Sequence, residues 1–410
     1  MSRPVILVSG KDPLAEENGR GHTSYVRAHA RAAIRAGFEP HIFAVGPGPE
    51  RESSDIGFIY RCATWLRPYR QVLIPVHSSP LAGGIAALVP TFAAREPLVI
   101  HGFGVWSYAG VQAARRLDRG GARVHPIASS YTTYEDEARS MLDGFVPGTS
   151  VVTKLRYAGQ YAWVKLAITN FERAGYVGSR FVMVNYAAVG RLIRAAHGDA
   201  VTLRMSRYGP ESAFLRCAPA PDRGPRDPAR PAIVSVTTHS PRKGVDVLIE
   251  ALARLNAGGI DFRATIVGGG PLLEPHRALV RARGLERTVT VTGYVDDVLP
   301  YLLDADAFVL PSRREQSGSL AVLEAMQAGI PVIASACDGL PEDLDDGVSS
   351  LLVPPGDSAA LAAALQRLIG DPALRRNLAQ NAAAAFEARF SAAAFSDDLG
   401  AAYGEATAGP

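Results

Sequence analysis

Segments of strand character alternate with segments of helical character along this 410-residue chain, and no other feature limits the fold as much. The chain opens with an apolar run at 4–9, a helical pattern at 24–36 and a second apolar run at 40–45. Two strands joined by a helix form a βαβ unit, the connection that parallel strands require. The pattern therefore predicts an α/β fold built on parallel sheets.

The remaining elements follow the same alternation. The first half has three further strand patterns, with helices between them, at 98–100, 124–129 and 181–184. In the second half the strands are expected at 232–237, 263–267, 288–292, 307–310 and 331–335. Helices are expected there at 244–255, 272–283, 298–303, 319–328, 359–369, 372–389 and 395–406.

A proline-rich stretch divides the two halves. Residues 218–231 hold five prolines in fourteen positions, which no regular helix or strand tolerates. We therefore expect a first domain at 1–217, a linker at 218–231 and a second domain at 232–389. Each domain reads as a Rossmann-like, doubly wound sheet, and we expect the two to face each other across a ligand-binding cleft.

Composition favours a globular protein of the cytoplasm. Hydrophobic residues make up 47% of the chain and charged residues 20%, which suits full-sized cores and excludes a disordered chain. No apolar run reaches the roughly 18 residues that span a bilayer, and the first apolar run is too short for a signal peptide. The three cysteines, Cys62, Cys217 and Cys337, lack the spacing of metal ligands and fit a reducing compartment.

Charge is distributed unevenly between the halves. Residues 1–216 hold 26 Lys and Arg against 16 Asp and Glu, a net +10, whereas the rest holds 17 against 24, a net −7. A basic first domain suits a phosphorylated acceptor or peripheral contact with the anionic inner face of a membrane. A solvated Arg-rich surface explains the same excess, so the partner stays open.

The densest chemical signal lies at residues 310–326. A strand ends at Pro311, a polar loop with Gly318 follows, and a helix opens near Ser319. Free N–H groups and the helix dipole make such a loop an anion site. Glu324 stands in an apolar stretch, where an unpaired carboxylate is costly, so we expect a hydrogen-bonding partner such as ribose hydroxyls. A solvent-facing Glu is the alternative.

A second signal is Lys243, which lies between a strand and a helix and is the only lysine after residue 165. In a chain that otherwise uses Arg, a compact charge at a helix start indicates a phosphate ligand, with an ordinary surface lysine as the alternative. The run Gly268–Gly269–Gly270 invites a dinucleotide reading, but the full motif is absent, and a tight strand-to-helix turn explains the glycines better.

Further candidates lie in the first half. The loop 18–22 carries glycines that allow close backbone approach to a phosphate or sugar. His101 follows the strand at 98–100, a position where parallel sheets place ligands. Asp304 and Asp306 have the spacing of a metal motif, but they flank a buried strand, and we interpret them as structural. We find no metal-binding or nucleophile motif.

Together these stretches resemble glycosyltransferase family 4, the retaining glycosyl transferases group 1 with the GT-B fold of two Rossmann-like domains. The resemblance covers nearly all of 4–406 and is strongest at 232–356. The matching motifs are Lys243-Gly244, Gly268-Gly269-Gly270-Pro271, the stretch 291–295, the stretch 305–312, the stretch 323–332 and the stretch 352–357.

The resemblance implies roles for individual residues. His101 and Glu315 would lie beside the reacting sugar as the catalytic residues. Arg20, His22 and Phe103 are the acceptor-side candidates. The implied donor-binding residues are Gly21, Arg242, Lys243, Gly293, Tyr294, Val295, Gln316, Ser317, Gly318, Ser319, Leu320 and Glu324. Among these, Lys243 would bind the diphosphate and Glu324 the ribose. The final helix, about 390–410, would pack back on the first domain.

Several positions depart from the family's pattern. Eight residues separate Glu315 and Glu324, where the family usually has seven, so the loop carries one extra residue or Glu315 is not the working acid. Thr238 replaces an Arg, and Arg242 is the available substitute. Arg20 replaces a loop glycine, and Phe103 replaces a second histidine. These changes put the orientation of the donor in question.

The resemblance implies a hexosyl- or N-acetylhexosaminyl-type glycosyltransferase (EC 2.4) that uses a nucleoside-diphosphate sugar, by family frequency a UDP-sugar, and needs no metal or cofactor. The acceptor hydroxyl would belong to a glycan, a lipid-linked molecule or a small molecule. An epimerase or phosphorylase on the same fold and a nucleotide-sugar-binding protein without turnover are the alternatives. The sequence predicts no nucleic-acid partner and leaves the oligomeric state open.

Overall fold

The computed structural model describes residues 3–14, 22–46, 51–62, 74–91, 97–143, 150–207, 230–315 and 317–408. Contacts divide the chain into two compact units. Unit 1 comprises Met1–Ser140, Val152–Glu211 and Ser391–Pro410, and unit 2 comprises Met141–Val151 and Ser212–Phe390. The last segment of the chain therefore belongs with the first unit. Of the predicted linker at 218–231, only the last two residues lie within the described part.

Unit 1 is built on a sheet that has eight strands in the part of the chain described, in the order β3-β4-β2-β1-β5-β6-β7-β8. All neighbours are parallel except the β3–β4 hairpin. The strands are β1 Arg3–Lys11, β2 Phe38–Val45, β3 Arg51–Ser54, β4 Gly57–Cys62, β5 Leu98–Phe103, β6 Val124–Ser130, β7 Val182–Val184 and β8 Leu203–Met205.

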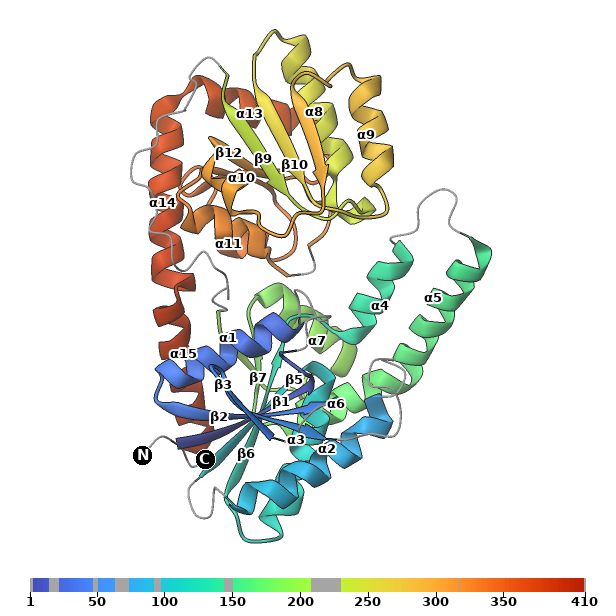
Figure 1. Cartoon of the computed structure of the whole chain (residues 1–410), viewed down its shortest axis with the longest axis vertical. Coiled ribbons are helices and arrows are strands. Elements are labelled where there is room, and N and C mark those ends of the chain that lie inside the picture. Colours follow the sequence, from blue (N-terminus) through green and yellow to red (C-terminus); the bar gives the residue numbers. More distant parts are fainter. Residues whose placement is uncertain are drawn as a thin grey trace. The chain divides into compact units, whose positions relative to one another are not determined.

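Helices cover both faces of this sheet. On one face, α2 and α3 bury apolar side chains against alternate residues of the central strands, such as Ile6, Val8 and Ile100. On the other face α15 packs on α1, with the Ser396 hydroxyl donating to the Ala32 carbonyl at 2.8 Å (Figure 1). The helices are α1 His22–Arg35, α2 Ile74–Leu88, α3 Ser107–Asp118, α4 Tyr134–Asp143, α5 Val151–Trp163, α6 Thr169–Gly178, α7 Ala187–His197 and α15 Ala392–Thr407. A π-helical segment, Val164–Ile168, continues α5, and short 3-10 turns cover Val89–Thr91 and Gly104–Trp106.

Unit 2 is built on a parallel sheet with the order β11-β10-β9-β12-β13-β14 among the described residues. The strands are β9 Ala232–Val236, β10 Arg263–Val267, β11 Val289–Gly293, β12 Ala307–Leu310, β13 Val332–Ser335 and β14 Ser350–Val353. Figure 1 shows β9, β10 and β12 side by side within this unit.

Both faces of the unit 2 sheet are buried, as the apolar runs predict. Successive residues of β12 point to opposite sides: Ala307 and Val309 join a core with α8 and α13, whereas Phe308 and Leu310 join a core with α11 and α14. The helices are α8 Val245–Ala257, α9 Leu273–Ala282, α10 Leu299–Leu303, α11 Leu320–Gln327, α12 Leu340–Asp343, α13 Ser358–Gly370 and α14 Pro372–Phe390, with a 3-10 turn at Pro241–Lys243.

The predicted α/β architecture is confirmed, and so is the interpretation of Asp304 and Asp306 as structural residues. Asp304 pairs with Arg263, and Asp306 accepts a hydrogen bond from the Ala232 N–H at 2.7 Å, so this pair of carboxylates is structural. The sequence analysis did not predict strands β3, β4, β8 and β14, each of which lies at a sheet edge or next to one. No helix in the described part of the chain has both the length and the hydrophobicity to cross a membrane.

Candidate functional site

The strand order of unit 2 identifies where its ligand site should lie. The chain runs outward from β9 to β11, then returns to place β12 on the other side of β9. At such a reversal the loops after the two neighbouring strands diverge, and the carboxyl ends of the strands leave a crevice in which ligands bind. The loop after β9 leads to Lys243, and the loop after β12 leads to Glu315.

These two residues form a buried ion pair at the reversal. The Lys243 ammonium nitrogen lies 2.6 Å from each carboxylate oxygen of Glu315, and the residues are 9% and 5% exposed. Burial lowers the pKa of Lys243 below its ordinary value, although the charge of Glu315 acts in the opposite direction. Sequence reasoning assigned both residues to the site but did not predict that they touch.

Two further side chains fix the Glu315 loop. The Ser312 hydroxyl donates to Glu315 Oε1, and the Glu315 backbone N–H donates to Asp338 Oδ2 at 2.6 Å. Asp338 has a φ of 50°, a left-handed conformation that costs energy in any residue other than glycine. Beside it, burial and the charges of Asp338 and Glu315 raise the pKa of the Cys337 thiol to about 12. The loop is therefore held from both ends.

Gly244 explains how the Lys243 loop comes this close to the β12 loop. Its φ is 61°, and a Cβ at this position would lie 2.1 Å from the Pro311 carbonyl oxygen. A residue with a side chain would both strain the backbone and push the two loops apart. The Lys-Gly sequence at a helix start thus combines a cation with the one residue type that lets its loop reach β12.

The guanidinium groups beside the pair have different settings. Arg313 makes two 2.7 Å bonds to the Asp246 carboxylate and is thereby held on the side of α8. Arg242 donates no hydrogen bond shorter than 3.4 Å among the described residues, and its backbone carbonyl accepts from the N–H groups of Arg313 and Arg314. Arg242 is therefore the cation next to Lys243 that is less committed to protein partners.

Helix α11 begins at the far end of the Glu315 loop. Ser319 is the residue before its first turn, has an extended backbone, and makes no side-chain capping bond. Ser317 is fixed through its carbonyl, which accepts from the Gly339 N–H, and Gln316 lies outside the described residues. Glu324 is half-buried one turn into the helix. The anion site that the sequence predicts at the N-terminal end of α11 stays a prediction.

The predicted base-side residues lie beside the glycine turn. A Cβ on Gly269 would lie 3.4 Å from the Cβ of Tyr294, so the loop of Gly293, Tyr294 and Val295 adjoins the turn after β10. The Tyr294 side chain is 69% exposed. Gly268 donates its N–H to the Gly293 carbonyl at 2.9 Å, which joins the two loops directly. The turn is a strand-to-helix turn, as expected, and it supports a flat, exposed aromatic ring.

A buried histidine pair lies under the same turn and was not singled out from the sequence. Nδ1 of His239 and Nδ1 of His276 are 2.8 Å apart, so one ring must donate to the other. Burial, with the nearby charges of His276 and Arg277, lowers the pKa of His239 to about 4. His239 follows β9 and His276 lies on α9, the helix after the neighbouring strand β10, so the parallel pairing of β9 with β10 is the signal that could have identified the pair.

In unit 1 the corresponding reversal lies between β1 and β5, where β5 ends in His101 and Phe103. His101 is fully buried, with Nε2 2.7 Å from the Ser129 hydroxyl and Nδ1 3.1 Å from the Tyr403 hydroxyl. Its ring stacks on Phe103, and burial keeps its pKa well below the ordinary value. Arg20, Gly21 and the His22 side chain lie outside the described part of the structure.

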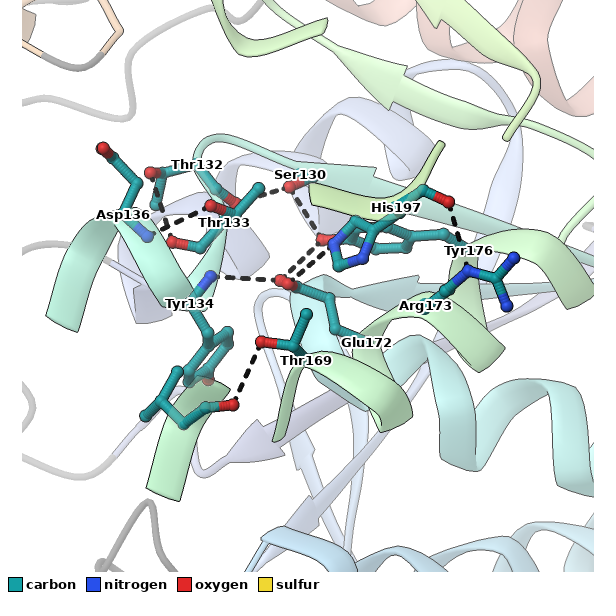
Figure 2. Close-up of polar contacts among 11 residues, drawn as sticks. Ser130, Thr132, Thr133, Tyr134, Asp136, Thr169, Glu172, Arg173, Tyr176 and His197 are labelled. Atoms are coloured by element: carbon teal, nitrogen blue, oxygen red, sulfur yellow. Dashed lines mark hydrogen bonds and ion pairs between the residues drawn. The ribbon is translucent and has the colours of Figure 1, made fainter. Parts of the chain in front are cut away.

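Unit 1 also holds a buried carboxylate that the sequence did not reveal (Figure 2). Glu172 of α6 accepts from the Tyr134 N–H at 3.3 Å and lies 3.0 Å from Nε2 of His197. The Tyr176 hydroxyl stands 3.2 Å from Glu172 Oε1 and 2.8 Å from the Ser130 hydroxyl, so its one proton is shared between them. Because Ser130 ends β6, this network fixes the loop that follows the sheet's carboxyl edge.

Comparison with known proteins agrees with this geometry. Residues 230–371 match the family model for glycosyl transferases group 1. The chain is 36% identical over 178 residues to the alpha-D-kanosaminyltransferase of Streptomyces kanamyceticus, covering 43% of this chain and 46% of that protein. It is 39% identical over 140 residues to the putative colanic acid biosynthesis glycosyltransferase WcaL of Salmonella typhimurium, covering 32% and 34%. The matches span only about a third to a half of these curated relatives.

Solved structures match over nearly the whole chain. Sucrose-phosphate synthase from Thermosynechococcus elongatus is 23% identical with a TM-score of 0.71, covering 98% of both chains. The Anabaena protein Alr3699/HepE in complex with UDP is 17% identical with a TM-score of 0.66, covering 98% of this chain and 100% of that one. At this level of identity the likeness establishes the fold, and the expectation of two Rossmann-like units of the GT-B type is confirmed.

Proposed function

We propose that this protein is a glycosyltransferase that moves a sugar from a nucleoside-diphosphate sugar to an acceptor hydroxyl, with the donor held by unit 2. The observation that carries the proposal is the buried Lys243–Glu315 pair at the sheet reversal, inside the residues that match the glycosyl transferases group 1 model. The relatives' names support it, since those quoted above are all transferases of sugars.

In this proposal the donor's diphosphate binds Lys243, assisted by Arg242 and by the N–H groups at the start of α11. Those N–H groups belong to residues 317–320, with Gln316 beside them. Glu324 would accept hydrogen bonds from the ribose hydroxyls, and the loop of Gly293, Tyr294 and Val295 would contact the base. Gly21, in the first loop of unit 1, would approach the donor through its backbone.

The chemistry follows from the charge that develops on the leaving group. As the bond between the sugar and the diphosphate breaks, negative charge grows on the phosphate oxygen, and Lys243 with the α11 N–H groups would stabilise it without a metal ion. The acceptor oxygen then bonds to the anomeric carbon, and its proton would pass to the oxygen of the departing diphosphate. We propose transfer with retention of configuration, on the resemblance to glycosyltransferase family 4.

The Glu315 carboxylate competes with the donor's diphosphate for Lys243. In this structure Glu315 neutralises Lys243, so an incoming diphosphate must displace or share the carboxylate. Displaced, Glu315 would face the transferred sugar, the role expected for it.

His101 is proposed to act near the transferred sugar, with Arg20, His22 and Phe103 on the acceptor side. Because both His101 nitrogens have partners within unit 1, direct contact with the sugar would require one of these partners to be exchanged. A UDP-linked hexose or N-acetylhexosamine is the proposed donor. The Anabaena protein Alr3699/HepE in complex with UDP and with UDP-glucose supports this choice of nucleotide. Relatives named for kanosamine and for GDP-mannose make the sugar an experimental question.

A donor panel tests the proposal. UDP-, GDP- and ADP-sugars are incubated with the protein and a mixture of glycan and lipid-linked acceptors, with and without EDTA, and nucleoside diphosphate release and product mass are measured. Release from one donor, unchanged by EDTA, is expected. Product formed without an acceptor would indicate an epimerase, and the absence of binding to every donor would refute the assignment of the site in unit 2.

Site variants sharpen the test. Lys243→Gln and Glu324→Gln should each weaken donor binding about ten- to hundredfold, the cost of on the order of 1.5–3 kcal/mol for losing a charged hydrogen-bond partner. Arg283→Gln is the matched control, because Arg283 is an exposed cation of the same unit bonded to Glu250. Equal binding by all three variants would contradict the assignment.

A further inference from the structure

Helix α5 is the least buried helix of its length in the described part of unit 1. It runs over Val151–Trp163 and contains no buried residue. It is attached through its continuation: Val164 and Ile168 of the π-helical segment enter the unit 1 core, and Tyr161 packs against them. In Figure 1 it lies beside α4, and the Tyr161 hydroxyl donates to the Glu135 carboxylate at 3.2 Å.

The outward face of this helix is apolar. Positions 151, 155, 158, 162 and 166 recur at a spacing of three or four residues and are all exposed, whereas 153, 157, 160, 161, 164 and 168 are half-buried or buried. The outward positions hold Val, Leu, Ala, Ala and Leu, and Leu155 and Leu166 are 67% and 76% exposed. The neighbouring Val152 and Trp163 widen the stripe. We refer to this set as the α5 stripe.

Cations flank the α5 stripe on both sides. At 100° per residue Lys154 and Lys165 fall along one edge of the stripe and Arg156 falls along the other. No Asp or Glu occurs between residues 150 and 168, although two of the four lysines of the chain lie there. Lys165 contacts Glu135 at 3.4 Å but is itself 59% exposed. The surface is thus apolar in its centre and positive at its edges.

This arrangement has the chemistry of a helix that lies in a membrane interface. Water-exposed stripes of Leu, Val and Trp are unfavourable, and contiguous apolar patches on soluble proteins mark interaction sites. In a membrane interface, Leu and Trp side chains insert between the lipid headgroups, which removes the apolar centre of the surface from water. Lys and Arg lie at the level of the lipid phosphates, which pairs the positive edges with negative charge. A protein partner would not by itself call for cations on both edges, whereas an anionic bilayer does.

We propose that the α5 stripe with Lys154, Arg156 and Lys165 is the surface by which this protein binds anionic lipid bilayers. The proposal is independent of the donor chemistry above, because none of these residues belongs to the proposed site. It identifies, within the basic first half of the chain, a surface where positive charge and several exposed apolar side chains coincide. A lipid-anchored acceptor would then meet unit 1 at the bilayer surface.

The test is co-sedimentation of the full chain with vesicles of equal parts phosphatidylglycerol and phosphatidylcholine, compared with phosphatidylcholine alone, at low salt. Binding to the anionic vesicles only is expected. Lys154→Gln/Arg156→Gln/Lys165→Gln should weaken it roughly a hundredfold, at about fivefold per cation. The control removes three exposed arginines of unit 1 at the end of α3, Arg115→Gln/Arg116→Gln/Arg119→Gln, with the same change of net charge.

The apolar half is tested separately. Leu155→Gln/Leu166→Gln should weaken vesicle binding at least tenfold, whereas Met205→Gln/Val348→Gln, at exposed apolar positions elsewhere, should not change it. Brominated lipids should quench the fluorescence of wild-type protein, and Trp163→Phe should remove most of that quenching while binding persists. Far-UV circular dichroism of each variant checks that the chain is folded and keeps this result separate from the proposed function.

Three outcomes would overturn the proposal. Wild-type protein that does not sediment with anionic vesicles would refute it directly. Equal weakening by the α3 control and the α5 charge variant would show that net charge, and not this surface, drives the binding. A dimer in light scattering that becomes a monomer on Leu155→Gln/Leu166→Gln would show that the stripe is covered by a second copy of the chain.

Discussion

The two units place different chemistry at equivalent positions of their sheets. At the reversal of unit 2, loops after β9 and β12 bring together the charges of Lys243 and Glu315. At the reversal of unit 1, β5 presents His101, whose pKa is kept low by burial and whose partners are hydroxyl groups. Under the proposed function, the charged pair of unit 2 would suit a diphosphate and the neutral rings of unit 1 would suit a different substrate.

The difference also has an energetic side. A buried ion pair is worth little as long as it is intact, but removal of one partner leaves an isolated charge in a poorly solvated place. A neutral hydrogen bond between an imidazole and a hydroxyl costs less to break. Single substitutions should therefore lower the stability of the two units unequally. The two units can be followed separately, because the chain's three tryptophans, at 65, 106 and 163, all precede the unit 2 sheet and their fluorescence reports on the first half.

The largest effect is expected for Lys243→Met. It leaves Glu315 buried without its cation and should lower the free energy of unfolding by about 3–5 kcal/mol, measured by urea titration with far-UV circular dichroism. Lys243→Met/Glu315→Gln should restore most of this loss. Breaking the exposed Arg283–Glu250 pair with Arg283→Met should cost far less, because water screens an exposed pair. Equal losses for the two single variants would mean that the pair is solvated.

Gly244→Ala should follow, with a loss of roughly 3 kcal/mol and weaker nucleotide binding. The new Cβ is strained by a φ of 61° and meets the Pro311 carbonyl. Gly284→Ala is the matched control, because Gly284 has a φ of 63° with no atom within 4 Å of an added Cβ. The control should lose only about 1 kcal/mol, the cost of the left-handed conformation alone. If both variants behaved alike, the contact between the two loops would not be tight.

In unit 1, Tyr403→Phe should cost about 1–2 kcal/mol. The substitution removes the hydroxyl next to His101 Nδ1 and leaves a buried nitrogen without that partner. The change should be seen in tryptophan fluorescence during urea unfolding. Tyr301→Phe, in the apolar core of unit 2, is the control and should be nearly neutral. A loss comparable to that of Lys243→Met would contradict the contrast drawn between the units.

The smallest effect is a pH dependence that both units share. Burial lowers the pKa of His239 in unit 2 and of His29 in unit 1 to about 4. The folded state therefore favours the neutral rings. Their contribution to the free energy of unfolding is fully present above pH 6.5 and is lost as the pH falls toward 4. Each ring should lower the free energy of unfolding by about 1 kcal/mol between pH 7.5 and pH 5.5. His239→Gln should flatten the dependence of the circular dichroism transition, while His29→Gln should flatten that of the fluorescence transition.

How well the sequence predicted each unit follows from the same contrast. In unit 2 the important residues stand in contiguous loops with recognisable turns, so Lys243, Gly244 and the Glu315 loop could be found without a structure. What could not be found was the pairing of Lys243 with Glu315, because 72 residues separate them and only the adjacency of β9 and β12 brings them together. The roles of the predicted donor-binding residues stay predictions.

In unit 1 the informative contacts join residues that no local pattern connects. His101 and Tyr403 are 302 residues apart, and Glu172 and His197 meet only because α6 and α7 pack near the end of β6. Local periodicity predicted the strand that carries His101 but not the partners that bury it. The edge strands β3 and β8 were missed because neither contains a buried residue, so neither gives an apolar run in the sequence.

The location of α15 in unit 1 has a consequence for how the chain is made. A ribosome delivers unit 2 in full before it releases the helix whose Tyr403 and Ser396 complete unit 1. Unit 1 is thus synthesised first but completed last. Until α15 is released, its sheet lacks the helix that packs on α1. Chains stalled or clipped before residue 391 should retain a native unit 2 joined to an unfinished unit 1, which is the species that chaperones and proteases would meet.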